Sequence, residues 1–284
     1  MAIPGPIRIV EVGPRDGLQN QAELVPTEVK IAFVDALSLS GFDEIEVSSF
    51  VSPKWIPQLA DAAEVFAGIQ RAPGVTYMAL VPNEEGLERA QAARVDKIAV
   101  FTAASETFSR KNTNASIAET LRRFEPVVAK AGVPVRGYIS TAFHCPYEGP
   151  IAPGQVLPVA RALIELGCTE LSIGDTIGKA IPAEVRHLLE LLIPLEPPVR
   201  LALHLHDTYG HAVDNARAAL AMGIKTFDAS TGGIGGCPYA PGAAGNVATE
   251  MLVAAFGGRT GVDPARLAAA AAIVQPYLKP RDGQ

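Results

Sequence analysis

The chain has 284 residues, of which 48% are hydrophobic and 19% are charged, a balance typical of a globular protein with a substantial core. Its 24 basic and 30 acidic residues give a net charge of −6 without any Lys/Arg run, which argues against a protein that binds nucleic-acid backbones. No apolar stretch approaches the roughly 20 residues of a membrane-spanning helix. Three cysteines cannot form a disulfide framework and no targeting signal is recognisable, so we expect a cytoplasmic protein of a bacterial cytosol.

Short β-branched runs alternate with longer amphipathic stretches along the whole chain. Candidate strands lie at 7–12, 44–48, 76–81, 97–101, 135–141, 170–173, 200–206 and 225–230. The stretches between them carry apolar residues at three- and four-residue spacing, which predicts helices such as 29–39 and 156–166. Eight strand–helix units of about 35 residues each are typical of a (β/α)8 TIM barrel.

A doubly wound open sheet is the alternative fold, because it gives the same alternation with fewer strands. Two features favour the closed barrel. The candidate strands continue along the chain without a break in composition, and no Gly-rich dinucleotide or phosphate loop follows the first strand. We therefore predict a single α/β domain over residues 1–284, with the barrel at 7–256 and an extra C-terminal helix within 260–280.

The loop after the first predicted strand carries the first candidate site residues. In TIM barrels the active site lies at the C-terminal ends of the strands. Arg15 can bind an oxygen anion through two hydrogen bonds, and Asp16 can ligate a hard cation. Gln19 adds a side-chain amide for substrate binding in the same loop. The structural alternative for this fragment is an Asp-Gly turn with a neighbouring ion pair.

Two histidines end the seventh predicted strand. Side chains alternate along a strand, so His204 and His206 face the same way, roughly 6.6 Å apart, while Leu203 and Leu205 face the helices. Two imidazoles on one face at the mouth of a barrel form half of a candidate metal site. Core or capping histidines are the alternative interpretation.

Two carboxylates and a glycine-rich loop complete the candidate set. Glu46 and Asp175, near the ends of two other strands, are expected to face the barrel interior, which is costly unless each is paired or catalytic. The segment 232–246 contains Cys237 and ends at Asn246. Glycine-rich turns can close over a site, so we predict a functional loop, with a connector that holds an inert buried cysteine as the alternative.

Several long motifs together resemble the 3-hydroxy-3-methylglutaryl-CoA lyase family. They lie at 10–20 (VEVGPRDGLQN), 49–55 (SFVSPKW), 145–149 (CPYEG), 174–178 (GDTIG), 204–210 (HLHDTYG) and 235–240 (GGCPYA). The resemblance runs from about residue 7 to 256. A wider group of metal-dependent TIM-barrel lyases and Claisen-condensing enzymes shares the Arg-Asp-Gly and His-x-His elements, whereas the cysteine-bearing glycine loop is specific to the lyases.

This resemblance implies cleavage of 3-hydroxy-3-methylglutaryl-CoA to acetoacetate and acetyl-CoA, with leucine degradation and ketone body formation as the usual setting. It also implies a divalent cation cofactor held by the residues that match Asp16, His204, His206 and Asn246. One carboxylate, one amide and two imidazoles form an open site that suits Mg²⁺ or Mn²⁺.

The resemblance further implies roles for residues around the cation. Arg15 matches the residue that stabilises the enolate, Cys237 matches the loop thiol that assists proton transfer, and His204 is a candidate general base. Glu46 and Asp175 match further active-site carboxylates.

Two more positions bear on the acyl-CoA substrate. Lys111 and Asn112 resemble a family stretch near CoA and are predicted to bind it, whereas His144 is expected to be a solvated loop histidine. Partners are therefore expected to be a small acyl-CoA and further copies of this chain, in a dimer or tetramer. A condensing or aldol-type relative acting on another 3-hydroxy acid, and a noncatalytic barrel that binds acyl-CoA or metal, are the alternative functions.

Overall fold

The computed structural model describes residues 5–21, 23–235 and 245–278. Within these residues, eight parallel strands form a closed barrel in the order β1-β10-β9-β8-β5-β4-β3-β2. The barrel strands are β1 Arg8–Glu11, β2 Glu44–Ser49, β3 Thr76–Leu80, β4 Lys97–Ala103, β5 Val135–Ser140, β8 Glu170–Asp175, β9 Leu201–Leu205 and β10 Thr226–Ala229. Each overlaps one predicted strand, and the prediction of a TIM barrel is confirmed.

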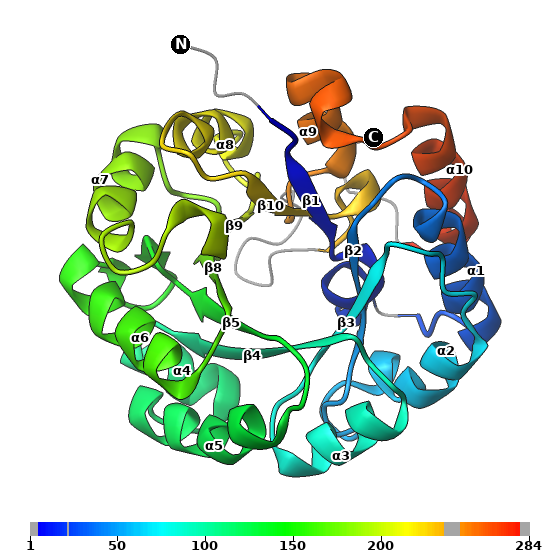
Figure 1. The fold of residues 1–284 in the computed structure, drawn as a ribbon, viewed down its shortest axis with the longest axis horizontal. Coiled ribbons are helices and arrows are strands. Elements are labelled where there is room, and N and C mark those ends of the chain that lie inside the picture. The colour runs from blue at the N-terminus through cyan, green and yellow to red at the C-terminus, as the bar shows by residue number, and fades with distance from the viewer. Residues whose placement is uncertain (1–4, 22, 236–244, 279–284) are drawn as a thin grey trace.

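Helices surround the barrel as a nearly complete outer ring (Figure 1). The α-helices are α1 Thr27–Ser38, α2 Ala62–Gly68, α3 Glu84–Ala92, α4 Glu106–Thr113, α5 Ile117–Lys130, α6 Pro153–Leu166, α7 Pro182–Leu192, α8 Ala212–Ala221, α9 Thr249–Phe256 and α10 Pro264–Val274. Short helical turns are η1 Gly13–Gly17, η2 Pro57–Leu59, η3 Pro198–Arg200, η4 Thr231–Gly233, η5 Gly257–Thr260 and η6 Gln275–Tyr277. A small antiparallel hairpin, β6 His144–Cys145 and β7 Gly149–Pro150, was not predicted.

The predicted C-terminal helix is α10, which packs against α1. It begins where the Asp263 carboxylate accepts hydrogen bonds from the backbone N–H groups of Ala265 and Arg266. It ends at Val274, inside the predicted range of 260–280, and the chain continues as the single turn η6, which contains Pro276. A proline has no backbone N–H to donate to the preceding turn, so it does not extend the helix.

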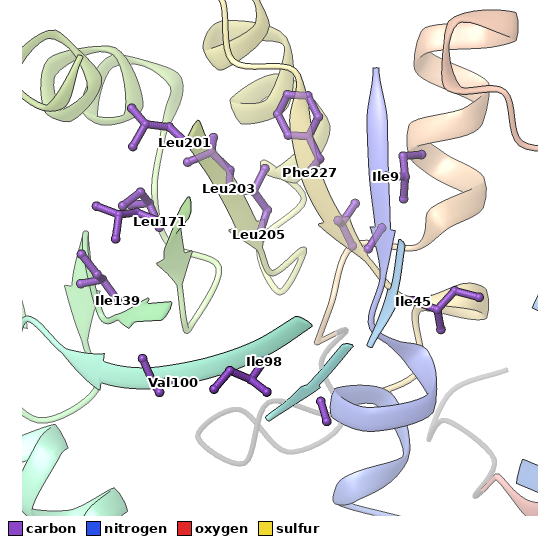
Figure 2. Close-up of a cluster of buried hydrophobic side chains, with 14 of the residues drawn as sticks. Ile9, Ile45, Ile98, Val100, Ile139, Leu171, Leu201, Leu203, Leu205 and Phe227 are labelled. Carbon is purple, nitrogen blue, oxygen red and sulfur yellow. The ribbon is translucent and has the colours of Figure 1, made fainter. Parts of the chain in front are cut away.

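The main apolar core lies between the barrel strands and the helices. The side chains of Leu203, Leu205 and Phe227 are buried there and point away from the barrel axis (Figure 2). Each such side chain contributes about 1.5–3 kcal/mol on burial. The outward orientation predicted for Leu203 and Leu205 is confirmed, and strand alternation therefore directs His204 into the barrel.

Toward the amino ends of the strands, the barrel interior is filled by ion pairs. The members of this network are three cations and three carboxylates, namely Arg8, Lys97, Arg136, Glu44, Glu170 and Asp228. Lys97 Nζ lies 2.8 Å from Glu44 Oε1, and Arg136 Nη2 lies 2.7 Å from Asp228 Oδ1. Buried charges persist only when opposite charges accompany them, and the equal numbers of the two signs meet that requirement.

Candidate active site

A π-helical turn after β1 positions the first two site residues. In η1, the Val12 carbonyl accepts the backbone N–H groups of Arg15, Asp16 and Gly17 at 3.2, 2.8 and 3.2 Å. Such wide turns are rare and concentrate at functional sites. The turn brings Arg15 and Asp16, which are adjacent in sequence, to the wall of the same cavity.

Arg15 joins two carboxylates at the mouth of the barrel. Its Nε donates to Glu46 Oε2 at 2.7 Å and its Nη1 donates to Asp16 Oδ1 at 2.6 Å. Glu46 is fully buried, and in the part of the chain that the structure describes its Oε1 has no hydrogen-bond partner. Burial raises the pKa of Glu46, although the charge of Arg15 opposes that shift. The inward orientation predicted for Glu46 is confirmed.

Three predicted cation ligands converge beside Arg15. Asp16, His204 and His206 each offer a ligand atom, and these atoms lie within 4.8 Å of one another. His204 Nε2 is 3.8 Å from Asp16 Oδ2, too far for a hydrogen bond and wide enough to admit an ion between the two atoms. His206 Nδ1 is buried and has no hydrogen-bond partner among the described residues. This donor set, with an unsatisfied nitrogen, fits a divalent cation.

Asn246, the last residue of the glycine-rich segment 232–246, reaches the same cluster. Its Nδ2 donates to Asp16 Oδ2 at 2.8 Å, and Asn246 pairs with His206 through an antiparallel backbone bridge. Gly235 lies against this amide with φ of +104°, and an added Cβ there would be 2.7 Å from Asn246 Nδ2. Only glycine combines that backbone conformation with room for the amide. All four predicted ligands therefore lie together.

The electrostatics of the cluster favour ligation. Burial alone would raise the pKa of Asp16, but Arg15 and the two histidines lower it to about 2. Burial, with the charge of His204, lowers the pKa of His206 to about 4. At neutral pH Asp16 is therefore a carboxylate and His206 a neutral imidazole, the protonation states that bind metal ions.

A cavity of about 920 Å³ opens above the cluster. Arg15, Asp16, His204 and His206 line it together with Gln19, Lys111 and Asn112. The predicted substrate-binding side chains therefore share one cavity with three of the four predicted cation ligands. Lys111 lies in the last turn of α4, where its Nζ is 4.9 Å from the centre of the Tyr147 ring. The cavity has the size of a small-molecule site.

Comparison of the sequence with known proteins identifies the family of the chain. The family model described as HMGL-like matches residues 6–274. The chain belongs to the HMGL-like family. It is 53% identical over 269 residues to a Pseudomonas aeruginosa protein named 3-hydroxy-3-isohexenylglutaryl-CoA/hydroxy-methylglutaryl-CoA lyase, covering 93% of this chain and 90% of the relative.

Solved structures of this HMGL-like type superpose over almost the whole chain. The hydroxymethylglutaryl-CoA lyase of Pseudomonas aeruginosa is 50% identical with a TM-score of 0.96, covering 100% of this chain and 97% of that one. An HMG-CoA lyase of Acinetobacter baumannii, in complex with coenzyme A and 3-methylmalate, is 36% identical with a TM-score of 0.90, covering 96% and 91%. Among the described residues of the present chain, no helix is long and apolar enough to cross a membrane.

Asp175 and His144 are placed differently from the prediction. Asp175 ends β8 on the outer face of the barrel, where its two oxygens accept the backbone N–H groups of Lys179 and Ala180 at 3.1 Å. The expectation that Asp175 faces inward is wrong, and its catalytic role stays a prediction.

His144 is half-buried in β6, with Nε2 3.1 Å from Glu184 Oε1, so the expectation of a solvated loop histidine is also wrong. Cys237 lies outside the described residues.

Two further residues at the candidate site were missed by the sequence analysis. Tyr138 lines the cavity, and its hydroxyl donates to Glu46 Oε2 at 3.3 Å. Asp228 accepts a hydrogen bond from His204 Nδ1 at 3.1 Å. Both occupy inward positions of predicted strands, so strand alternation could have identified them. An aspartate inside a strand is unusual in itself.

Proposed function

We propose that this protein cleaves 3-hydroxy-3-methylglutaryl-CoA to acetoacetate and acetyl-CoA in a divalent-metal-dependent retro-Claisen reaction. The observation that carries the proposal is the convergence of Asp16, His204 and His206 next to the buried Arg15 guanidinium, at the wall of one large cavity. The relatives that share about half of the sequence are named as lyases of this substrate, which supports the same reaction class.

Asp16, His204, His206 and Asn246 would hold Mg²⁺ or Mn²⁺, because mixed oxygen and imidazole donors suit these ions. The amide of Asn246 would turn over to present its oxygen, which has nearly the same shape as the nitrogen it replaces. When bound, the cation acts as a Lewis acid that lowers the pKa of the tertiary hydroxyl of the substrate.

Arg15 carries the charge stabilisation in this proposal. Its guanidinium is held in place by Glu46 on one side and Asp16 on the other, so it needs no reorganisation when negative charge develops on the thioester enolate. Glu46 therefore acts by fixing Arg15.

The two roles expected of His204 compete for one atom. Nδ1 of His204 is hydrogen-bonded to Asp228, so only Nε2 can either bind the cation or accept a proton. We assign it to the cation, and the hydroxyl proton then passes to another group. Cys237 remains the candidate for proton transfer to the enolate carbon.

Lys111, Asn112 and Gln19 would contact the CoA portion, because they share the wall of the cavity with the cation ligands. The Acinetobacter relative binds coenzyme A and 3-methylmalate, which supports an acyl-CoA in this cavity. A homo-oligomer, a cytoplasmic location and a place in leucine degradation stay predictions.

The test is an assay of acetoacetate release after EDTA treatment, with Mg²⁺ or Mn²⁺ added back. We expect activity on 3-hydroxy-3-methylglutaryl-CoA that disappears with the chelator and returns with the cation. Activity that is indifferent to EDTA, or no acetoacetate under any condition, would overturn the proposal.

A second candidate substrate has a longer substituent at C3. The Pseudomonas aeruginosa relative is also named for 3-hydroxy-3-isohexenylglutaryl-CoA, and the cavity of about 920 Å³ is large. The same assay with the isohexenyl ester separates the two candidates by the ratio of their kcat/KM values.

A further inference from the structure

We propose that Asp228 is a positioning residue that fixes the tautomer of His204 and keeps its Nε2 available for the cation. This inference rests on the proposed metal-dependent function, but it concerns side chains that lie behind the ligands. Asp228 is buried within β10, next to His204 on the neighbouring strand β9.

Both carboxylate oxygens of Asp228 accept hydrogen bonds from buried side chains. Oδ1 accepts a hydrogen bond from Arg136 Nη2 at 2.7 Å, and Oδ2 accepts from Ser172 Oγ at 3.0 Å and from His204 Nδ1 at 3.1 Å. Arg136 is itself completely buried, with Nε 2.8 Å from Glu170 Oε1. A guanidinium is permanently charged, so it keeps the facing carboxylate ionised.

An ionised carboxylate can only accept hydrogen bonds, so the proton between Asp228 and His204 belongs to Nδ1. A neutral imidazole carries one N–H, and Nε2 is therefore left with its lone pair. This is the atom that faces Asp16 Oδ2 at 3.8 Å. Outer hydrogen bonds of this kind set the orientation and basicity of a metal-binding histidine.

His206 has no equivalent support among the described residues, because its Nδ1 lacks a hydrogen-bond partner. The two imidazoles differ although they lie on the same strand segment with ring centres 5.4 Å apart. Asp228 therefore makes His204 the ligand whose tautomer is defined before any cation arrives.

Asp228→Asn tests this idea because an amide has only one acceptor oxygen. Arg136 can only donate, so the amide oxygen must face Arg136 and the amide nitrogen must face His204. Nδ1 of His204 then has to accept, and its proton moves to Nε2, where it blocks ligation. The same substitution behind a catalytic histidine in serine proteases also produces the wrong tautomer.

The experiment combines two measurements on the full-length protein. Nitrogen-15 NMR of labelled histidines, on metal-free protein at alkaline pH, should show His204 with its proton on Nδ1 in the wild type and on Nε2 in Asp228→Asn. Electron paramagnetic resonance of free Mn²⁺ should show affinity about 10–100-fold lower in the variant. Asp61→Asn is the matched control, because Asp61 pairs with Lys30 far from the cluster and should change neither quantity.

Three outcomes overturn the inference. Wild-type affinity together with an unchanged tautomer in Asp228→Asn would remove Asp228 from its positioning role, while the metal-dependent function would stand. A wild-type His204 whose neutral form carries its proton on Nε2 would overturn the inference even if Asp228→Asn does not fold. Wild-type protein that binds no Mn²⁺ and releases no acetoacetate would instead overturn the proposed function, and this inference with it.

Discussion

Arg15→Gln removes a buried cation that holds two carboxylates, and we expect it to lower both the stability of the protein and its kcat. Glu46 is fully buried and loses contacts of 2.7 and 2.6 Å to the guanidinium, so its charge is left without a cation. Removing one partner of a buried ion pair costs about 3–5 kcal/mol of unfolding free energy. Losing a preorganised donor to a developing oxyanion lowers kcat by about 10²–10³-fold.

A double-mutant cycle with Glu46→Gln separates the two effects. Glu46→Gln removes the charge that Arg15 would leave behind, so the double variant should regain most of the unfolding free energy that Arg15→Gln loses, as measured by urea unfolding. Its kcat should stay as low as that of Arg15→Gln, whereas Glu46→Gln alone should lower kcat less. If kcat of the double variant recovered in parallel with stability, Arg15 would have a structural role only, and the enolate assignment would be wrong.

Three further predictions concern the cluster, the loop and β8. His206→Ala should weaken Mn²⁺ binding more than about tenfold, and an unchanged titration would remove His206 from the ligand set. Cys237→Ala should keep Mn²⁺ binding and lose most turnover, whereas near-wild-type activity would exclude the thiol from proton transfer. Burial raises the pKa of Asp175 to about 6, so the native state keeps a proton that the unfolded chain releases above about pH 4. Wild-type unfolding free energy should therefore fall by about 2–3 kcal/mol between pH 4 and pH 7 relative to Asp175→Asn, and parallel pH profiles would contradict this.

The barrel could be predicted because its strands are buried on both faces and leave compact β-branched runs in the sequence. The site could be predicted as far as strand ends and motifs define it, which covers Arg15, Asp16, His204 and His206. The π-turn that aims Arg15 and Asp16 could not, since it depends on one carbonyl that accepts three N–H groups.

The predicted positions of Asp175 and His144 were wrong for different physical reasons. Asp175 follows Leu171 and Ile173 at two-residue spacing, and these belong to the outer core, so strict alternation predicts its outward orientation. The position of His144 is set by its contact with Glu184, forty residues further along the chain. No local sequence pattern predicts such a contact. Long-range pairs of this kind become visible only once the helices are placed.

The pairing of β1 with β10 brings together the two parts of the candidate cation site. Asp16 follows β1, whereas His204 lies in β9 and His206 directly after it, so a sheet that is open between β1 and β10 would separate these predicted ligands. A cation that binds only the closed barrel stabilises it by mass action, by about 2.7 kcal/mol at a cation concentration 100 times Kd. The concentration of the cation would then set the unfolding free energy of the protein as well as its turnover.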